Sequence, residues 1–283
     1  MLDLSVVVPA RNAAGFISEC LASIIQEEPK EVIVVDGLST DATVEIALGF
    51  GTRVMSDGGR GLPAARVMGA TAARCKHVAL IDVDVVLPKN SLAKLLEEFE
   101  RGGYTALQAG LDSVAGPGYW GQALANHHRT GRSRHWFGLV ATIFDRDTLL
   151  KHGFDDRFLS GEDIELRWRL KRAGVKCGVS KHVAVVHRFG DSFDFAKSQF
   201  QADGHGLGRM VVMKGGWKSL SLLALPAVAG IRGIFLTLVR LRPKWIPYYL
   251  AFVAFNYWAM LEEIGSSLRK QPSSRSQSPP GSP

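Results

Sequence analysis

The sequence predicts an α/β protein built on a parallel, doubly wound sheet and ending in an apolar helical segment. Short runs rich in valine and isoleucine alternate with segments of helical periodicity through the first 90 residues, which is typical of parallel sheets. Polar residues follow these runs, where the strands should end. The chain of 283 residues, 46% of them hydrophobic, is also long and apolar enough to bury a substantial core.

The first strand is predicted over residues 4–8, an apolar run that Pro9 closes. Apolar residues then recur at helical spacing through residues 16–25, and Asn12 is placed to cap this helix. Asp3 and the turn after the strand leave no room for the basic, apolar and cleavage regions of a signal peptide. We therefore expect the first strand to belong to the mature protein.

Three further strands are expected in the N-terminal body, over residues 32–35, 53–55 and 78–81. A helix that opens at residues 39–41 and runs through residue 47 separates the first two of them. The carboxyl ends of parallel strands meet at one edge of a sheet, where ligands bind. Asn12, Asp36 and Asp82 follow three different strands, so we expect them to line one crevice.

Asp82 and Asp84 are separated by one residue in the apolar run 80–88, and this run by itself predicts a buried strand. Burying a carboxylate is costly unless a cation or hydrogen-bond donors compensate for it. Mg²⁺ or Mn²⁺ would do so, because such cations take oxygen ligands and usually bind through one or two carboxylates together with substrate phosphates. Alternatively, the two aspartates only end a strand and open a turn toward Pro88.

Several motifs of other nucleotide-binding enzymes are missing. No Gly-x-Gly-x-x-Gly follows the first strand and no Walker sequence is present, which disfavours a dehydrogenase and a P-loop enzyme. The glycine-rich run 204–208 does not follow a strand, and we interpret it as a flexible segment. The glycine-rich and basic stretch 116–134 predicts either a mobile acceptor loop or a solvated connection, and His127, His128 and His135 are weaker candidates for the site.

The net charge of +7 is concentrated near the C-terminal end. Residues 1–196 hold 23 lysines and arginines against 24 acidic residues, whereas residues 197–283 hold 11 against 3. Residues 219–241 are almost wholly apolar, and a second apolar run covers residues 246–261 with tryptophan and tyrosine near its edges. Basic and aromatic flanks of this kind are typical of a membrane interface. Core helices of a soluble domain, or a dimer interface, are the alternatives.

Neither apolar run is a clear membrane span. The second is shorter than the ~20 residues that a bilayer requires, and the first contains Arg232 and Pro226. If both crossed, the basic connection at Arg240, Arg242 and Lys244 would lie opposite the basic flanks, against the positive-inside tendency. We therefore expect a monotopic or re-entrant hairpin within a basic, membrane-associating segment of residues 196–270, followed by a disordered tail over residues 271–283.

At several positions the chain resembles the family 2 glycosyltransferases, inverting enzymes with the type-A glycosyltransferase (GT-A) fold. The similar segments occur in order at residues 5–12, 34–41, 60–70, 82–84 and 161–163. The resemblance implies a Rossmann-like, mostly parallel sheet flanked by helices in a catalytic domain of residues 1–195. It divides this domain into a nucleotide-sugar half, about residues 1–110, and an acceptor half, about residues 111–195. It also implies a divalent metal, Mn²⁺ or Mg²⁺.

The resemblance also implies roles for residues on the donor side. Asp36 is assigned to the nucleobase, although an ordinary turn residue would look the same, and Asp84 is the expected direct metal ligand. Asp82 is assigned to the ribose or the metal. The other residues expected at the donor are Pro9, Ala10, Arg11, Asn12, Arg60, Arg66 and Val83. His187 resembles a histidine that binds the metal or diphosphate in some relatives, with a strand-end histidine that has no ligand as the alternative.

The acceptor side is represented by Gly161-Glu162-Asp163 at the start of a predicted helix. By resemblance Asp163 is the general base, with Glu162 as the second catalytic acid of the pair. Ser160 and Asp163 also resemble a capping box, and both interpretations can hold together. In this helix we expect Trp168 to pack and Arg167 and Arg169 to be solvated.

The sequence thus predicts a metal-dependent transferase that moves one sugar from a UDP- or GDP-sugar to an acceptor hydroxyl. The Gln-x-x-Arg-Trp signature of processive relatives is missing, which favours single transfer over polymer synthesis. The acceptor is expected to be lipid-linked or a cell-envelope glycan. Three widely spaced cysteines favour a reducing compartment, so we expect a peripheral or monotopic protein at the cytoplasmic membrane face.

Other functions remain open on the sequence alone. A polyprenyl-phosphate glycosyltransferase would have a phosphate acceptor and need no strong base. A non-catalytic, membrane-associated scaffold of a polysaccharide assembly complex could keep the fold, although retention of Asp36, Asp82, Asp84 and Asp163 argues against it. Nucleic acid is not an expected partner, because the basic C-terminal part is also strongly apolar.

Overall fold

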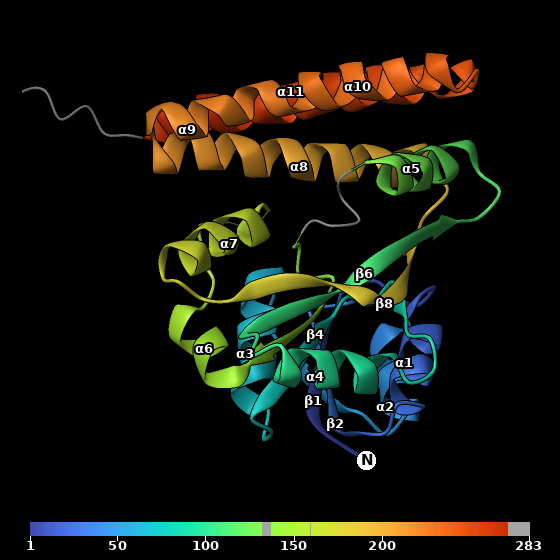
Figure 1. The fold of residues 1–283 in the computed structure, drawn as a ribbon, viewed down its shortest axis with the longest axis vertical. Coiled ribbons are helices and arrows are strands. Elements are labelled where there is room, and N and C mark those ends of the chain that lie inside the picture. The colour runs from blue at the N-terminus through green and yellow to red at the C-terminus, as the bar shows by residue number, and fades with distance from the viewer. Residues whose placement is uncertain (132–136, 159, 271–283) are drawn as a thin grey trace, which may run out of the picture. The chain divides into compact units, whose positions relative to one another are not determined.

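The computed structural model describes residues 1–131, 137–158 and 160–270. These residues form two compact units, which divide after Ala196 (Figure 1). His135, the last residues of the predicted acceptor stretch and the predicted disordered tail lie outside the described residues.

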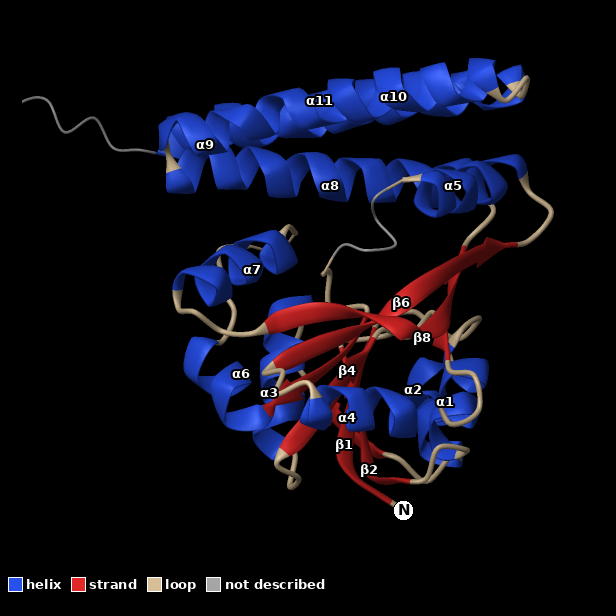
Figure 2. Ribbon diagram, in the orientation of Figure 1, coloured by secondary structure: helices blue, strands red, loops and turns tan. Residues whose placement is uncertain are grey.

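The first unit is built on one eight-stranded sheet (Figure 2). Its strands are β1 (Leu2–Ala10), β2 (Pro29–Asp36), β3 (Arg53–Ser56), β4 (His77–Ile81), β5 (Val85–Val86), β6 (Ala106–Ala115), β7 (Ala141–Asp145) and β8 (Cys177–Phe189). They lie in the order β3-β2-β1-β4-β7-β6-β8-β5. β1 to β4 pair in parallel, as do β6 and β8, whereas β7 and β5 run antiparallel to their neighbours. The predicted α/β class with a mostly parallel sheet is confirmed.

Helices cover both faces of this sheet. One face packs against α1 (Ile17–Ile25), α2 (Thr43–Gly49) and α4 (Ser91–Arg101), and the other against α3 (Leu62–Ala72), α6 (Arg146–His152) and α7 (Glu162–Arg172). The alternation of strand side chains explains why: Val6 and Val8 join the first core, and Val7 joins the second. Both faces of β1 are therefore buried, as expected of a parallel strand whose run of residues 4–8 is apolar except for Ser5.

The four strands expected in the N-terminal body are confirmed, but the apolar run 80–88 is not one strand. β4 ends at Ile81 and β5 covers only Val85–Val86. Between them the backbone N–H of Val85 donates to the carbonyl of Asp82 at 3.0 Å. Asp82 and Asp84 therefore lie in a turn, where their side chains can leave the core.

The stretch 116–134, predicted to be a loop, contains a helix, α5 (Tyr119–Thr130). Its apolar face, which includes the buried Leu124, packs on β6. Gly118 and Gly131 occupy the N-cap and C-cap positions. The glycines of this stretch thus bound a helix, which is why the composition suggested a loop.

The second unit is helical. Its elements are α8 (Phe193–Lys214), which begins in the first unit, α9 (Gly216–Leu220), η2 (Ser221–Ala224), α10 (Leu225–Val239), η3 (Pro243–Trp245) and α11 (Ile246–Lys270). The predicted flexible run 204–208 lies inside α8, so this prediction was wrong. A Cβ on Gly204 would lie 2.3 Å from the Asn256 carbonyl oxygen of α11. The glycines there permit a close helix contact and do not loosen the chain.

The two apolar runs of the sequence form α10 and α11, which pack side by side through glycines. A Cβ on Gly233 would lie 2.0 Å from the Tyr249 ring, and one on Gly230 would lie 2.3 Å from Val253. Among the described residues, only the segment Ser221–Val239 is long and apolar enough to cross a membrane, by length and composition, and 28% of it is buried. A helix in the core of a soluble protein would be mostly buried.

Candidate active site

The loops after β1 and β2 are tied together at one edge of the sheet. Asp36, the last residue of β2, is 7% exposed, and both oxygens of its carboxylate accept the backbone N–H of Ser39, at 3.1 and 3.3 Å. The Asn12 Oδ1 accepts the backbone N–H of Thr40 at 2.8 Å. Asn12 therefore lies beside the β2 loop and does not cap α1, whose N-cap residue is Phe16. The predicted convergence of Asn12 with Asp36 is observed.

The other residues predicted for the nucleotide lie around this edge. Pro9 and Ala10 end β1 opposite Val35 and Asp36, and the exposed Arg11 lies against Gly37. Arg60 precedes α3, and its Nε donates to the carbonyl of Asp57 at 2.9 Å.

Asp57 is a residue that the sequence reasoning missed. Its buried carboxylate accepts the backbone N–H groups of Gly59 at 2.6 Å and Gly61 at 3.0 Å. It thereby shapes the loop that carries Arg60. An aspartate followed by two glycines was the available signal, because Asp side chains commonly bond the backbone two residues on.

Asp84 and His187 meet across two antiparallel strands. Val85 of β5 lies opposite His187 of β8, and the Asp84 Oδ2 lies 3.3 Å from the His187 Nε2. His187 lies inside β8, two residues before its end. Burial lowers the pKa of His187, but the carboxylate of Asp84 outweighs it, and the pKa is raised overall.

The chemistry of this cluster fits a hard divalent cation. The Asp84 Oδ1 is buried with no hydrogen-bond partner, a costly state for a carboxylate oxygen. Among the described residues, no three His, Cys, Asp or Glu side chains form a metal cage. An open site of this kind suits Mg²⁺ or Mn²⁺, which take their remaining ligands from phosphates and water. Val83, between the two aspartates, is partly buried against the core.

Arg66 links the turn after β4 to the start of α7. Its guanidinium is 2% exposed and donates to the Asp82 Oδ1 at 2.8 Å and to the Glu162 Oε1 at 2.7 Å. Burial raises the pKa of Asp82, and the charge of Arg66 opposes that rise. The ion pairs join the predicted donor side to the predicted acceptor side.

The acidic pair at the start of α7 divides into two different environments. Glu162 is buried and bonded to Arg66, whereas Asp163 stays partly exposed. A capping box requires a serine or threonine at the N-cap, but the N-cap here is Gly161, with a φ of 74°. The predicted capping box is therefore wrong, because a left-handed glycine, and not Ser160, opens the helix. Of the two acids, Asp163 is the one accessible to a second substrate.

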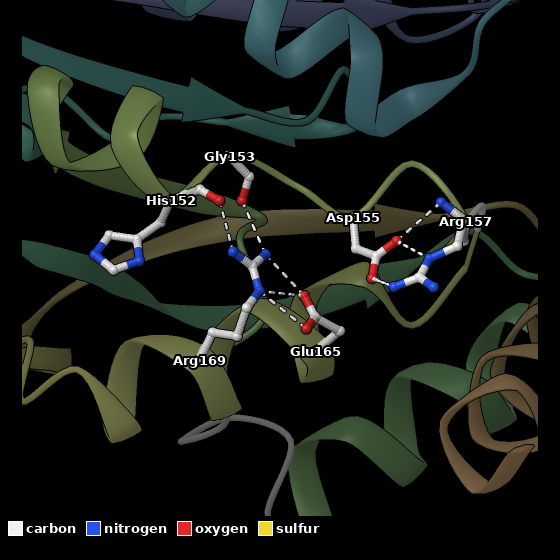
Figure 3. A network of polar contacts seen from close by, with 6 residues as sticks. All are labelled: His152, Gly153, Asp155, Arg157, Glu165 and Arg169. Carbon is white, nitrogen blue, oxygen red and sulfur yellow. Dashed lines mark hydrogen bonds and ion pairs between the residues drawn. The ribbon is translucent and has the colours of Figure 1, made fainter. Parts of the chain in front are cut away.

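Arg169 fixes α7 to the end of α6 (Figure 3). Its Nε donates to both oxygens of the buried Glu165, at 2.8 and 2.9 Å. Its two terminal nitrogens donate to the carbonyls of His152 at 2.6 Å and Gly153 at 3.0 Å. The prediction that this arginine is solvated was wrong, because it bonds a buried acid of its own helix and two carbonyls of a helix end that is distant in sequence. Through this contact α7 holds Asp163 on a fixed support.

We expect Arg169→Ala to lower the free energy of unfolding by about 2–4 kcal/mol, because it removes the bidentate partner of a buried carboxylate. Arg157→Ala is the matched control: Arg157 also bonds an aspartate in Figure 3, Asp155, but its side chain is 62% exposed, and no measurable change is expected. Urea unfolding followed by circular dichroism compares the two variants. Equal midpoints would contradict a supporting role for Arg169.

α5 brings a second histidine to the cluster. The ring of His128 lies 6.3 Å from that of His187 and 4.8 Å from that of Phe189. Burial lowers the pKa of His128 well below its usual value, and the neighbouring His127 and His187 lower it further. A neutral imidazole therefore borders the Asp84–His187 pair. The sequence made His128 only a weaker candidate for the site, because the stretch read as a loop or a solvated connection.

The chain is similar to known proteins. The model of the family described as glycosyl transferase family 2 matches residues 5–156. The succinoglycan biosynthesis protein ExoO of Rhizobium meliloti is 27% identical over 209 residues, which are 65% of this chain and 60% of the relative. A 4,4'-diaponeurosporenoate glycosyltransferase of Staphylococcus aureus is 34% identical over 113 residues, 37% of this chain and 30% of the relative. The chain thus covers less than two thirds of either relative's length.

Solved structures share the fold over more of the chain. The mannosyltransferase PcManGT of Pyrobaculum calidifontis, in complex with GDP-Man and Mn²⁺, has a TM-score of 0.64 at 18% identity and covers 92% of this chain and 88% of that one. S. aureus TarS 1–349 with UDP-GlcNAc has a TM-score of 0.53 at 15% identity, with coverages of 95% and 85%. At these identities the likeness establishes the GT-A fold and no more.

Proposed function

The chain belongs to glycosyl transferase family 2, and we propose that it is a metal-dependent, inverting enzyme that transfers one sugar from a UDP- or GDP-sugar to an acceptor hydroxyl. The observation that carries this proposal is the buried, unpartnered Oδ1 of Asp84 beside His187. Arg66 joins this cluster, through Asp82, to the helix that carries Asp163. These contacts support a donor site and an acceptor site at one edge of the sheet.

The donor is assigned to residues 1–110. Asp36 can accept a hydrogen bond from an N–H group of uracil or guanine, while its own position is fixed by Ser39. Arg11 and Arg60 supply positive charge at the loops after β1 and β3. Support for a nucleotide-sugar comes from solved proteins of the same fold, which were captured with GDP-Man and UDP-GlcNAc.

Asp84 would be the main protein ligand of Mn²⁺ or Mg²⁺, with His187 beside it. Asp82 is held nearby by Arg66, and among the described residues the two aspartates and the histidine do not form a closed cage. When bound, this cation acts as a Lewis acid for the departing diphosphate. Arg66 of α3 orients the Asp82 carboxylate through the 2.8 Å ion pair. Mn²⁺ is present in the complex of PcManGT, which supports this class of cation.

Asp163 is assigned as the general base. It lies in the first turn of α7, where the helix dipole favours an ionised carboxylate. In this position it takes the proton of the acceptor hydroxyl as the sugar is transferred. Glu162 cannot share this role while its carboxylate is bonded to Arg66, so it acts by holding the start of α7.

The acceptor is assigned to residues 111–195 and is a lipid-linked or cell-envelope glycan. ExoO is a succinoglycan biosynthesis protein, which supports a cell-envelope glycan. The apolar second unit supports a peripheral or monotopic location at the cytoplasmic membrane face, with residues 196–270 as the associating segment. A polyprenyl-phosphate acceptor is the second candidate, and it predicts that Asp163 is dispensable.

Release of the nucleotide from UDP- and GDP-sugars in the presence of Mn²⁺ or Mg²⁺ tests this function in detergent. Asp84→Ala is expected to lower metal-dependent release about 100-fold or more, because it removes the main protein ligand of the cation. Asp147→Ala, whose side chain is 92% exposed on α6, is the matched control and should keep the wild-type rate.

Calorimetry of donor binding completes the test, since slow release could reflect only a missing acceptor. A wild-type protein that neither releases nucleotide nor binds any UDP- or GDP-sugar is not a transferase of this type. Release that is insensitive to both chelator and Asp84→Ala would overturn the metal site alone.

A further inference from the structure

α10 leaves one apolar stripe exposed along its length. Leu225, Val228, Ile231, Phe235 and Leu238 recur at intervals of three and four residues and are 43–69% exposed. The opposite side of α10 is its buried stripe of Pro226, Gly230, Gly233 and Thr237, whose glycines meet α11. A surface helix of a soluble protein presents polar residues on its outer face, so this stripe requires a different environment.

α11 repeats the pattern. It packs on α10 through Tyr249 and Val253, and on α8 through Asn256 and Met260. The remaining side exposes Leu250, Trp258 and Leu261, which are 59%, 64% and 66% exposed. Exposed apolar surface on two adjacent helices marks a site of interaction with a protein or a membrane.

The charge around these stripes identifies the partner. Residues 204–261 contain seven lysines and arginines and no aspartate or glutamate. Arg240, Arg242 and Lys244 are exposed in the connection between the two helices, next to Leu241, which is 88% exposed. Glu262, next to Leu261, is exposed, but the connection between the two helices carries basic residues alone and complements a bilayer that carries anionic headgroups.

The position of Arg232 favours a helix pair that lies in the membrane surface. The segment Ser221–Val239 is long and apolar enough to cross a membrane by length and composition, so its length does not decide between an in-plane helix and a span. Arg232 is exposed beside Ile231, within the apolar stripe. From an in-plane helix this arginine can reach the headgroups, whereas in a span it would lie near the bilayer centre.

We propose that the exposed stripes of α10 and α11 form a lipid-binding face that inserts in plane into an anionic bilayer, with Arg240, Arg242 and Lys244 on the headgroups. This inference deepens the membrane location in the proposed function, on which it rests, and names the surface and the lipid class. Binding to vesicles does not require turnover, so the lipid-binding face and the proposed enzyme activity can fail separately.

Co-sedimentation of the full chain with vesicles tests the proposal. Strong binding is expected to phosphatidylcholine vesicles that contain phosphatidylglycerol, and weak binding to phosphatidylcholine alone. Ile231→Glu with Phe235→Glu should weaken binding about tenfold or more. Leu48→Glu is the matched control, because Leu48 is an exposed leucine (58%) on α2 of the first unit, and it should bind as the wild type does. Arg240→Ala with Arg242→Ala should reduce binding to the anionic vesicles about tenfold and leave binding to neutral vesicles unchanged.

Three outcomes would overturn the proposal. Equal binding of the wild type and the Ile231/Phe235 variant would exclude the stripe. A dimer in sedimentation velocity that this variant dissociates, without vesicle binding by the wild type, would make the stripe an interface between two copies. Protection of the Arg240–Lys244 connection from protease added outside proteoliposomes would indicate a span. Nucleotide release in detergent, measured on the same samples, shows whether each variant is folded and tests the proposed function independently.

Discussion

Asp163→Asn is expected to lower kcat for sugar transfer by about 10²–10⁴-fold and to leave the Kd of the nucleotide-sugar nearly unchanged. An asparagine amide keeps the size of the side chain but cannot accept the proton of the acceptor hydroxyl. No neighbour can replace it, because the other acid at the start of α7, Glu162, is bonded to the buried Arg66. Transfer of radiolabelled sugar to membrane glycolipids, together with calorimetry of the donor, measures both quantities.

Two variants sharpen this experiment. Asp163→Glu keeps the base and should recover part of the activity. Asp156→Asn changes another exposed aspartate in the segment before α7 and should have no effect. If Asp163→Asn transfers sugar at the wild-type rate, the acceptor needs no base, and the polyprenyl-phosphate alternative becomes the better account.

Arg66→Met is expected to lower the free energy of unfolding by about 3–5 kcal/mol and also to abolish turnover. Removing one partner of a buried ion pair leaves its carboxylates without compensation, and here two carboxylates, Asp82 and Glu162, depend on one guanidinium. Arg66→Lys should recover little, since an ammonium lacks the planar fork that reaches both acids. Urea unfolding followed by circular dichroism measures the loss.

A double variant separates the ion pairs from the packing of the arginine stem. Arg66→Met combined with Glu162→Gln should regain part of the stability, because one unpaired charge is removed. Arg53→Met, an exposed arginine on β3, serves as the control. If Arg66→Met unfolds at the wild-type urea concentration, the bridge contributes nothing to stability, and its role would be limited to the substrates.

Much of the first unit could be predicted from the sequence because its signals are local. Buried parallel strands require uninterrupted apolar runs, and the ends of β1, β2 and β4 carry Asn12, Asp36 and Asp82 where such strands place their ligands. The acids of α7 and His187 were found only by resemblance to a family. The pairing of Asp84 with His187 depends on the antiparallel register of β5 and β8, which no local pattern encodes.

Two of the errors share one physical cause. The structural role of a glycine depends on what packs against it. Gly204 suggested a flexible segment, yet it lies inside α8 and packs against the backbone of α11. Arg169 was expected to be solvated because arginines on a helix usually are, but two of its partners are carbonyl groups at the end of α6. In both cases the deciding contact comes from another element of the chain.

The candidate site is completed late during synthesis, because the strand that carries His187 is the last one in the described part of the chain. The family match ends at residue 156, but Glu162, Asp163 and His187 all lie beyond it. β8 enters the sheet between β6 and β5, and only then does His187 reach Asp84, 103 residues earlier in the chain. During synthesis the N-terminal strands can fold first, yet a nascent chain that stops before β8 cannot assemble the site. In the proposed function, sugar transfer therefore begins only when nearly the whole first unit has left the ribosome, and a fragment that ends before β8 is inactive.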